Sequence, residues 1–520
     1  AIGASIFASN IGSEHLIGLA GAGASSGMAM AHWEIQGWMI LILGWVFVPF
    51  YTRSMVYTMP EFLERRYNPQ SRTILSVISL VSYVLTKVAV TVYAGGLVFQ
   101  QVFGIKELWG IDFFWIAAIG LVVLTALYTI FGGMKSVLYT SVLQTPILLL
   151  GSLIILVLGF KELGGWDEMM RVCGAVTVND YGDTMTNLIR SNDDANFPWL
   201  GALIGSAIIG FWYWCTDQFI VQRVLSGKNE MEARRGTIFG AYLKLLPVFL
   251  FLIPGMIAFA LHQKYIGAGG EGFLPMLENG TANADAAFPT LVAKLLPAGV
   301  KGLVVCGILA ALMSSLASLF NSSAMLFTID FYKRFRPETP EKKLVGIGQV
   351  ATVVIVILGI LWIPIMRSVG DVLYTYLQDV QSVLAPGIAA AFLLGICWKR
   401  TSAQGGMWGL IAGMVIGLTR LGAKVYYSNA GEVADSTFKY LFYDMNWLFF
   451  CGWMFLFCII VVIVVSLATK APTAEKIQGL VFGTATKEQK AATRASWNHW
   501  DIIHTVIILA ITGAFYWYFW

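Results

Sequence analysis

The stretch ILLLGSLIILVLGF, residues 147–160, decides the kind of fold that this chain can form. It is a continuous apolar run, whereas a membrane-spanning β-strand alternates apolar and polar residues over about ten positions. Within a lipid bilayer every backbone polar group has to be paired inside the protein, and a helix pairs these groups within its own segment. The run therefore predicts a membrane-spanning α-helix in an all-α integral membrane protein.

The composition of the whole chain supports this interpretation. Hydrophobic residues make up 57% of the 520 residues and charged residues 12%, against about 45–50% and about 25% in soluble proteins. Such hydrophobicity, with 14% aromatic residues, excludes a disordered chain. A formal net charge of +4 is too small to indicate a nucleic-acid partner. The six cysteines form no recognisable disulfide or zinc pattern.

Thirteen stretches are long and apolar enough to cross a bilayer, whose hydrocarbon core of about 30 Å needs about 20 helical residues. Neither an initiator Met nor a basic stretch precedes the first of them, so we expect no secretory signal and a chain that starts inside a helix. The predicted spans lie at residues 3–26, 34–51, 73–103, 111–131, 137–160, 198–222, 238–262, 301–329, 345–366, 371–397, 402–423, 447–469 and 501–520.

The distribution of basic residues predicts which side of the membrane each loop faces. Successive loops alternate between the two sides, and one side carries 21 Lys and Arg residues against 11 on the other. Because cytoplasmic loops are enriched in Lys and Arg, the side with 21 is cytoplasmic. The first span then runs outward, and the acidic loop at residues 161–197 is external. A polar segment near residues 470–500 is predicted as a cytoplasmic linker or amphipathic helix.

Small and polar residues interrupt two of the spans near mid-depth. The first span contains ASNIGSEH at residues 8–15, and the sixth contains GSAIIGFWYWCTDQ at residues 205–218. These spans are five apart and therefore have opposite orientations, as expected for inverted repeats whose broken helices frame a central site. The alternative is that Gly and Ser only allow the helices to pack closely.

Several polar side chains lie in the predicted spans at a comparable depth. An unpaired charge at the bilayer centre costs about 2.5–3.5 kcal/mol, so these residues should face a partner or a cavity. Glu34 and Lys244 could instead form a purely structural ion pair. Aromatic faces combined with carboxylate, amide, imidazole and ammonium groups suit a neutral polyhydroxylated ring. The polar residues are His15, Glu34, Lys244 and Gln378, and the aromatic ones are Trp33, Trp212, Tyr213, Trp214 and Tyr374.

The eighth span contains AALMSSLASLFNSS at residues 310–323, which places the hydroxyls of Ser314 and Ser315 in the membrane. Serine often bonds its own helix carbonyl, which is the alternative explanation. However, an unwound segment frees carbonyl groups for a cation. The carbonyls of Ala8 and Ile11 beside the two hydroxyls would form an all-oxygen site without formal charge. Such a site favours sodium over calcium, which usually recruits carboxylates.

Seven motifs in these regions resemble the sodium/solute symporter family, in particular its sodium/glucose cotransporters. They are ASNIGSEHLIGLAG (8–21), TMPEFLERR (58–66), WYWCTDQFIVQR (212–223), GAYLKLLP (240–247), LMSSLASLFNS (312–322), FTIDFY (327–332) and LAPGIAAAFLLGICWKR (384–400).

The resemblance implies a LeuT-type five-plus-five inverted repeat with two discontinuous core helices and extra peripheral helices. The first repeat would occupy residues 1–160 and the second residues 198–397, on either side of the external loop at 161–197. Peripheral helices would fill residues 398–520. Family members have fourteen helices, so we expect that the leading peripheral helix is absent here.

The resemblance also implies the site residues, one motif at a time. The sugar hydroxyls would bond to Asn10, His15, Glu34, Lys244 and Gln378. Tyr213 would be the inner gate with Trp214 beside it, and Leu19, Trp33 and Tyr374 would close the site from outside. Sodium would bind the carbonyls of Ala8, Ile11 and Ala311 and the hydroxyls of Ser314 and Ser315.

The expected activity is sodium-driven symport of glucose or galactose by alternating access across the plasma membrane, or the inner membrane of a bacterium. No enzyme activity is expected, and no cofactor is expected apart from sodium as co-substrate. The partners would be sodium, a hexose and the lipid bilayer. Alternatives are symport of myo-inositol or sialic acid, or a sugar-gated sodium-conducting sensor.

One departure from the family pattern concerns a second sodium ion. Family members usually carry an Asp where this chain has Ser141, and members with a second sodium carry a Thr where this chain has Ala317. Both changes remove oxygen ligands, so the sequence favours one sodium per sugar.

Overall fold

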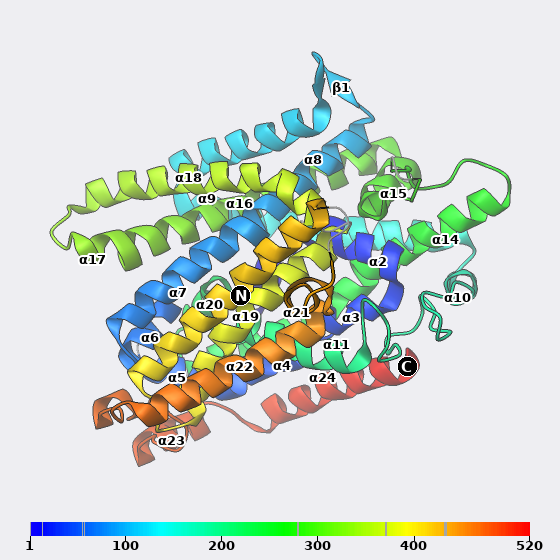
Figure 1. Ribbon diagram of the computed structural model, residues 1–520. Helices are drawn as coiled ribbons and strands as arrows, with labels where there is room; N and C mark the ends of the chain where they lie inside the picture. The colour runs from blue at the N-terminus through cyan, green and yellow to red at the C-terminus, as the bar shows by residue number, and fades with distance from the viewer. Residues whose placement is uncertain are drawn as a thin grey trace.

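A computed structural model describes residues 2–12, 14–54, 56, 58–277, 280–369, 372–430 and 434–520, without the side chains at 8, 9, 128, 130–145, 321 and 366–369. Figure 1 shows a bundle of helices in which helices from all parts of the chain lie alongside one another. The described residues also include a short antiparallel hairpin of β1 (Glu107–Leu108) and β2 (Ile111–Asp112). Its turn residues Trp109 and Gly110 both have positive φ, which is typical of a tight two-residue hairpin turn.

The first part of the chain forms short helical segments that follow one another closely. They are α1 (Ile2–Asn10), η1 (Glu14–Leu19), α2 (Ala20–Ser26), η2 (Gly27–Met30), α3 (Ala31–Glu34), α4 (Gly37–Ile42), η3 (Leu43–Phe47), α5 (Val48–Ser54), α6 (Met59–Arg66), α7 (Pro69–Ser82), η4 (Tyr83–Val88), α8 (Ala89–Phe103), α9 (Phe113–Leu163) and α10 (Trp166–Gly174).

The middle of the chain is also helical and carries the second interrupted span. Its elements are α11 (Trp199–Gly210), η5 (Phe211–Thr216), α12 (Gln218–Leu225), α13 (Glu230–Leu243), η6 (Val248–Leu252), α14 (Ile253–Gly267), η7 (Ala284–Ala286), α15 (Ala287–Leu295), α16 (Ala298–Met325), η8 (Leu326–Tyr332), α17 (Lys333–Phe335), α18 (Glu341–Val369) and α19 (Leu373–Cys397).

The last part of the chain adds helices outside this core. They are α20 (Ala403–Asn429), α21 (Thr437–Lys439), η9 (Tyr440–Asp444), α22 (Trp447–Ala468), η10 (Ala474–Lys476), α23 (Lys487–Ala495) and α24 (His499–Tyr518). α20 and α22 both contact α19, and small residues allow the close approach. A Cβ on Gly387 of α19 would lie only 2.9 Å from the Cα of Gly413 in α20.

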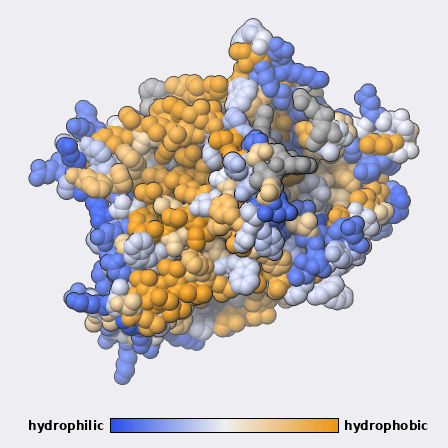
Figure 2. Space-filling view, in the orientation of Figure 1, coloured by the Kyte–Doolittle hydropathy of each residue, from blue (hydrophilic) through white to orange (hydrophobic). Residues whose placement is uncertain are grey.

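Eleven helical stretches in the described part of the chain are long and apolar enough to cross a membrane. The thirteen predicted spans differ from this number for two reasons. The stretch Glu14–Ser54 continues from the first predicted span through the second, and the fourth predicted span corresponds to a shorter apolar helix, Phe113–Leu127. In Figure 2, hydrophobic side chains gather over α7, α18 and α22 between hydrophilic ends, as expected of a surface that faces lipid.

The fourth and fifth predicted spans both fall within α9, which has 51 residues. A straight helix of that length would measure about 77 Å, more than twice the thickness of the hydrocarbon core. Both ends of α9 contact α16. Val122 and Leu127 line a groove with Phe320 and Met325, whereas Cβ atoms on Gly307 and Gly151 would touch Ile147 and Val304. The sequence predicted two spans here, at 111–131 and 137–160, whereas the structure joins them in a single helix.

The two predicted helix interruptions occur in the structure. α1 ends at Asn10 and η1 begins at Glu14, inside the stretch 8–15. The second break follows η5, where Asp217 adopts an extended conformation (φ −75°, ψ 127°) and its side chain caps α12 by accepting a hydrogen bond from Phe219 N. α19 contacts both η1 and η5, so it lies beside both breaks.

The external loop and the end of the chain lie together. Leu188 N, in the loop predicted to be external, donates a hydrogen bond of 2.8 Å to the carbonyl of Phe519, just after α24. In the predicted topology the first of thirteen spans runs outward, so the segments after the fifth and the thirteenth spans both lie outside. The contact places the two segments on the same side of the membrane, as that topology requires.

Candidate functional site

The breaks and α19 line a small polar cavity of about 40 Å³, below the range of about 300–1,000 Å³ that is usual for small-molecule sites. Four of the five residues predicted to bond sugar hydroxyls line it, together with both residues of the predicted inner gate. The fifth, Glu34, bonds to residues that line it. The lining residues are Asn10, Glu14, His15, Trp33, Gln36, Ile209, Gly210, Tyr213, Trp214, Lys244, Tyr374, Leu377, Gln378 and Gln381.

Glu34, the last residue of α3, is completely buried and is the centre of a charged network. Its Oε2 lies 2.6 Å from Lys244 Nζ, and its Oε1 accepts a hydrogen bond of 2.5 Å from Tyr374 OH. Lys244 directly follows α13 and also donates to Asn10 Oδ1 at 3.1 Å. The ion pair weighed as a structural alternative is thus formed, and it borders the cavity. Each charge compensates the other in a setting where a lone charge would be costly.

Asn10 links the first break to the second interrupted span. Its Oδ1 accepts a hydrogen bond from Lys244, and its Nδ2 donates a hydrogen bond of 3.2 Å to Tyr213 OH. Tyr213 and Trp214 meet edge to face, with ring centroids 5.0 Å apart. The residue that ends α1 therefore contacts both the charged network and the predicted inner gate.

Four buried polar atoms on three cavity-lining residues make no hydrogen bond within the described part of the chain. They are both ring nitrogens of His15, the indole Nε1 of Trp33 and the amide Oε1 of Gln378. His15 Nε2 lies 3.3 Å from Glu34 Oε2 without the geometry of a hydrogen bond. Because buried polar groups are nearly always paired, these atoms are available to a ligand with hydroxyl groups.

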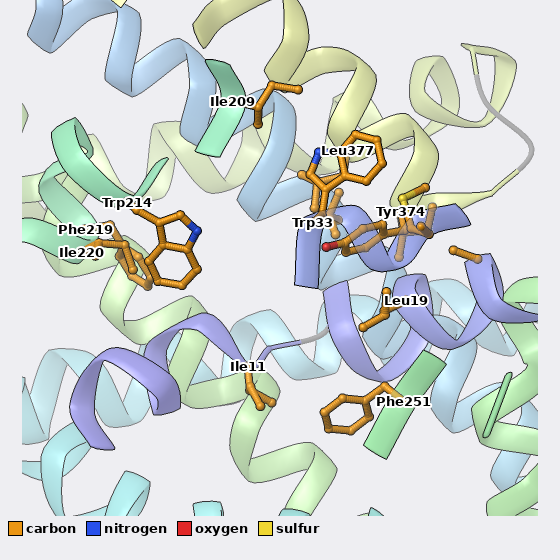
Figure 3. Packing of buried hydrophobic residues seen from close by; sticks show 14 of the residues in the cluster. Ile11, Leu19, Trp33, Ile209, Trp214, Phe219, Ile220, Phe251, Tyr374 and Leu377 are labelled. Carbon is orange, nitrogen blue, oxygen red and sulfur yellow. The ribbon is translucent and has the colours of Figure 1, made fainter. Parts of the chain in front are cut away.

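The three predicted outer residues are all buried. Figure 3 shows Trp33, Leu377 and Tyr374 gathered together near Leu19, while Trp214 lies apart from them with Phe219 and Ile220. Trp33 stacks on Trp447 of α22 at 5.4 Å, so a helix outside the core supports it. Leu19 is fully buried, but it is not one of the described residues that line the cavity.

The predicted cation site lies where α16 meets the first break. A Cβ on Gly12 would lie 3.1 Å from Ser315 Oγ, so a larger residue at position 12 would crowd this hydroxyl. Ile11 and Ala311 are buried, and Ala311, Ser314 and Ser315 all lie in α16. The backbone of Ala8 belongs to α1, but its side chain and that of Ser141 lie outside the described residues.

Sequence reasoning missed several residues at the site. Gln36, Gln381 and Glu14 line the cavity, and Gln36 Nε2 also donates to the carbonyl of Ser206 in α11. Near Tyr213, Lys87 Nζ forms an ion pair of 3.1 Å with Asp217 Oδ2. The same ammonium group lies 5.2 Å from the centroid of the Tyr213 ring. Most of these residues could have been singled out as polar residues inside apolar spans. Their partners could not, because they come from distant segments of the chain.

A polar cavity between two broken helices of a membrane-spanning bundle is the arrangement of a LeuT-type secondary transporter. The chain belongs to the sodium:solute symporter family, which it matches over residues 1–413. It is 36% identical over 496 residues to the human sodium/myo-inositol cotransporter 2, covering 93% of this chain and 72% of that protein. It is 39% identical over 498 residues to the sodium/glucose cotransporter 1 of Ovis aries, covering 90% and 72%.

Solved structures show the same fold. A sodium-coupled sialic acid symporter in a substrate-bound outward-open state superposes with a TM-score of 0.67 at 21% identity, over 91% of this chain and 90% of that one. The inward-facing conformation of Mhp1 superposes with a TM-score of 0.50 at 14% identity, over 92% of this chain and 93% of that one. The protein is therefore a sodium-coupled solute symporter, a multi-pass protein of the plasma membrane and not an enzyme.

Proposed function

We propose that the transported solute is a neutral hexose, glucose or galactose, bound in the cavity beside Glu34 and Lys244. The observation that carries this proposal is the set of unpaired polar atoms on His15, Trp33 and Gln378. They offer hydrogen-bond donors and acceptors without adding a formal charge, which suits the hydroxyls of a neutral ring. The aromatic rings of Tyr213, Trp214 and Tyr374 supply apolar faces for its C–H groups.

An acidic substrate fits this cavity less well. Lys244 is the only Lys or Arg among the described lining residues, and Glu34 already neutralises it. A carboxylate such as that of sialic acid would therefore add an uncompensated charge. Myo-inositol remains the second candidate, because it is another neutral ring with hydroxyl groups and because relatives of this chain are named sodium/myo-inositol cotransporters.

In this proposal, sodium binds between α16 and the first break and stabilises the conformation that receives sugar. A ligand shifts two states only by its difference in affinity for them, so Ser315 and the carbonyls near Ile11 must fit sodium better in one state. One charge at 100 mV supplies about 2.3 kcal/mol, and a tenfold sodium gradient adds about 1.4 kcal/mol. Together they allow roughly 500-fold accumulation of sugar at one sodium per sugar.

The decisive experiment is radiolabelled uptake into proteoliposomes with and without a sodium gradient. We expect sodium-dependent accumulation of glucose or galactose above the outside concentration. Accumulation of myo-inositol alone would assign the polyol as substrate. Sugar-dependent sodium current without sugar uptake would identify a sensor and overturn the proposal of hexose symport.

The coupling ratio is a separate prediction. Ala317 is fully buried in α16 and has no side-chain oxygen, and Ser141 lacks the carboxylate usual in the family. Burying a second ion without enough ligands is costly. We therefore expect one sodium per sugar, measured from reversal potentials at several ratios of sodium and sugar. A ratio of two would contradict this expectation.

A further inference from the structure

An apolar groove of about 870 Å³ runs along the surface between α18 and the wall formed by the end of α7, η4 and η8. On α18 its lining begins at Lys343 and ends at Leu358, and the lining residues share one helix face, because they recur at spacings of three and four. Gly346 leaves the groove open, since a Cβ there would meet no atom within 4 Å. Val350 and Leu358 are exposed, so the groove opens toward the lipid.

The groove has the length of one leaflet of a bilayer. From Lys343 to Leu358 an α-helix rises about 22 Å, and a bilayer with its head groups measures about 40–45 Å across both leaflets. In Figure 1, α17 lies at the end of the bundle that also carries α6 and α23. The basic residues of these segments were predicted to be cytoplasmic, so the groove extends from the cytoplasmic head groups to about the middle of the bilayer.

The cytoplasmic mouth of this groove is positively charged. Lys343 is exposed and is the only charged side chain among the described residues that line the groove. The segment 333–343, which leads to it, carries five Lys and Arg residues against two Glu residues. Arg334 in this segment donates to the carbonyl of Pro69, which is neutral, so this contact leaves the charge of Arg334 uncompensated.

A second groove beside α18 differs in its charge. It has about 740 Å³ and lies between α18, α9 and α16. Its charged lining residues are Lys333 and Glu341, which have opposite signs. The two grooves are similar in size and both are largely apolar, so an acyl chain alone would not distinguish them. A negatively charged head group would, because only the first groove combines an apolar wall with an unopposed positive charge.

We propose that the groove between η4 and α18 binds an anionic phospholipid of the cytoplasmic leaflet. Its phosphate lies at Lys343, and one acyl chain follows the groove toward Leu358. Anionic lipids are attracted by basic residues at the cytoplasmic face of a membrane, and basic pockets between helices there bind their head groups. The hydroxyl of Tyr332, which also lines the groove, is a further donor for the phosphate. This site is independent of which solute the protein transports.

The first test compares phosphatidylglycerol with phosphatidylcholine of the same acyl chains. Each lipid is titrated into the delipidated whole chain in detergent, and bound molecules are counted by native mass spectrometry. We expect the parent to retain one phosphatidylglycerol at concentrations where it retains no phosphatidylcholine. Lys343→Ala should weaken this binding about fivefold, the contribution of one Lys near an anionic head group. Lys343→Arg should restore it.

Lys342→Ala is the matched control for charge. Lys342 is an exposed neighbour in the same segment, but it is not among the described residues that line either groove. We expect this variant to bind phosphatidylglycerol within about twofold of the parent. Equal losses in Lys342→Ala and Lys343→Ala would overturn the inference, because they would indicate diffuse attraction to a basic surface. Equal retention of the two lipids by the parent would overturn it as well.

A second pair of variants tests the seat of the acyl chain. Gly346→Leu places a side chain in the groove, and Leu favours a helix more than Gly does, so the fold should persist. We expect it to weaken phosphatidylglycerol binding at least about threefold. Gly302→Leu is the control, because a Cβ on Gly302 of α16 also meets no atom within 4 Å and this residue lines neither groove in the described structure. Parent-like binding in Gly346→Leu would overturn the inference, as would displacement of the lipid by soluble glycerol phosphate, which lacks acyl chains.

Discussion

Replacing Glu34 with Ala should abolish measurable sugar binding. The change removes the carboxylate that compensates Lys244 at 2.6 Å and accepts from Tyr374 OH at 2.5 Å. Removing one partner of a buried ion pair usually costs about 3–5 kcal/mol, because the other charge stays buried and uncompensated. The Lys244 ammonium would then have to move or recruit water, and the wall of the cavity would change with it.

Gln378→Ala should weaken sugar binding by a smaller amount. Gln378 Oε1 makes no hydrogen bond in the described structure, so its loss leaves the protein network intact and deprives only the sugar of a partner. The expected cost is about 1–3 kcal/mol, or roughly five- to 150-fold in the dissociation constant. The two variants therefore distinguish Glu34, which holds other residues of the site in place, from Gln378, which bonds only to the sugar.

Both variants are tested by equilibrium binding of glucose and galactose at saturating sodium, with sodium binding measured separately. Sodium binding should change little, because neither residue belongs to the predicted cation site. Gln100→Ala is the matched control, since Gln100 bonds to Asp112 at the exposed end of α8. If Glu34→Ala and Gln378→Ala both bind sugar as the parent does, the sugar site lies elsewhere.

Much of the fold could be predicted because a chain in a lipid bilayer has to pair its backbone polar groups internally, which few structures do. Continuous apolar runs had to become helices, and the interrupted motifs at 8–15 and 205–218 marked the two breaks. The π-helical segments η1 and η5 beside the breaks were not predicted. They arise from a shift in backbone hydrogen bonding, which has no clear signature in composition.

Several residues of the site could be predicted because placing a polar side chain inside a membrane costs free energy and therefore needs a functional or structural reason. Glu34, Lys244 and Gln378 stood out in apolar spans, and the structure brings Lys244 to Glu34 although they are far apart in sequence. The partners of Tyr374 could not be predicted. It was expected only as an outer gate, yet its hydroxyl bonds to Glu34, because α19 passes beside the end of α3. Such pairings depend on how the helices pack, and one span alone does not encode them.

Gln36 and Lys87 also have partners that the sequence did not predict. Gln36 precedes the short helix α4 and looks like an ordinary polar residue near a span end, but it reaches the carbonyl of Ser206 and lines the cavity. Lys87 is a charged residue within a predicted span, but no residue near it in the sequence indicated that Asp217 is its partner. The ion pair forms only because the second break places Asp217 in an extended segment facing η4.

The substitution Ser315→Ala should eliminate sodium-driven uptake while leaving the fold intact. Ser315 Oγ lies at the first break, 3.1 Å from the position of a Cβ on Gly12. Its hydroxyl is one of only a few oxygens predicted to hold the cation, so the loss of one leaves an incompletely coordinated ion, which is costly in a site shielded from water. The packing cost is small, since Ala fits any helical position that Ser occupies.

The measurement is sugar uptake into proteoliposomes with and without a sodium gradient, together with thermal stability in detergent. Ser322→Ala provides the control, because Ser322 is a buried serine of the same helix, two turns further along and outside the predicted cation site. We expect Ser315→Ala to unfold within a few degrees of the parent and to lose sodium stimulation, while Ser322→Ala keeps both. Undiminished sodium stimulation in Ser315→Ala would show that the cation binds away from the first break, because a hydroxyl that coordinates the driving ion cannot be removed without changing its affinity.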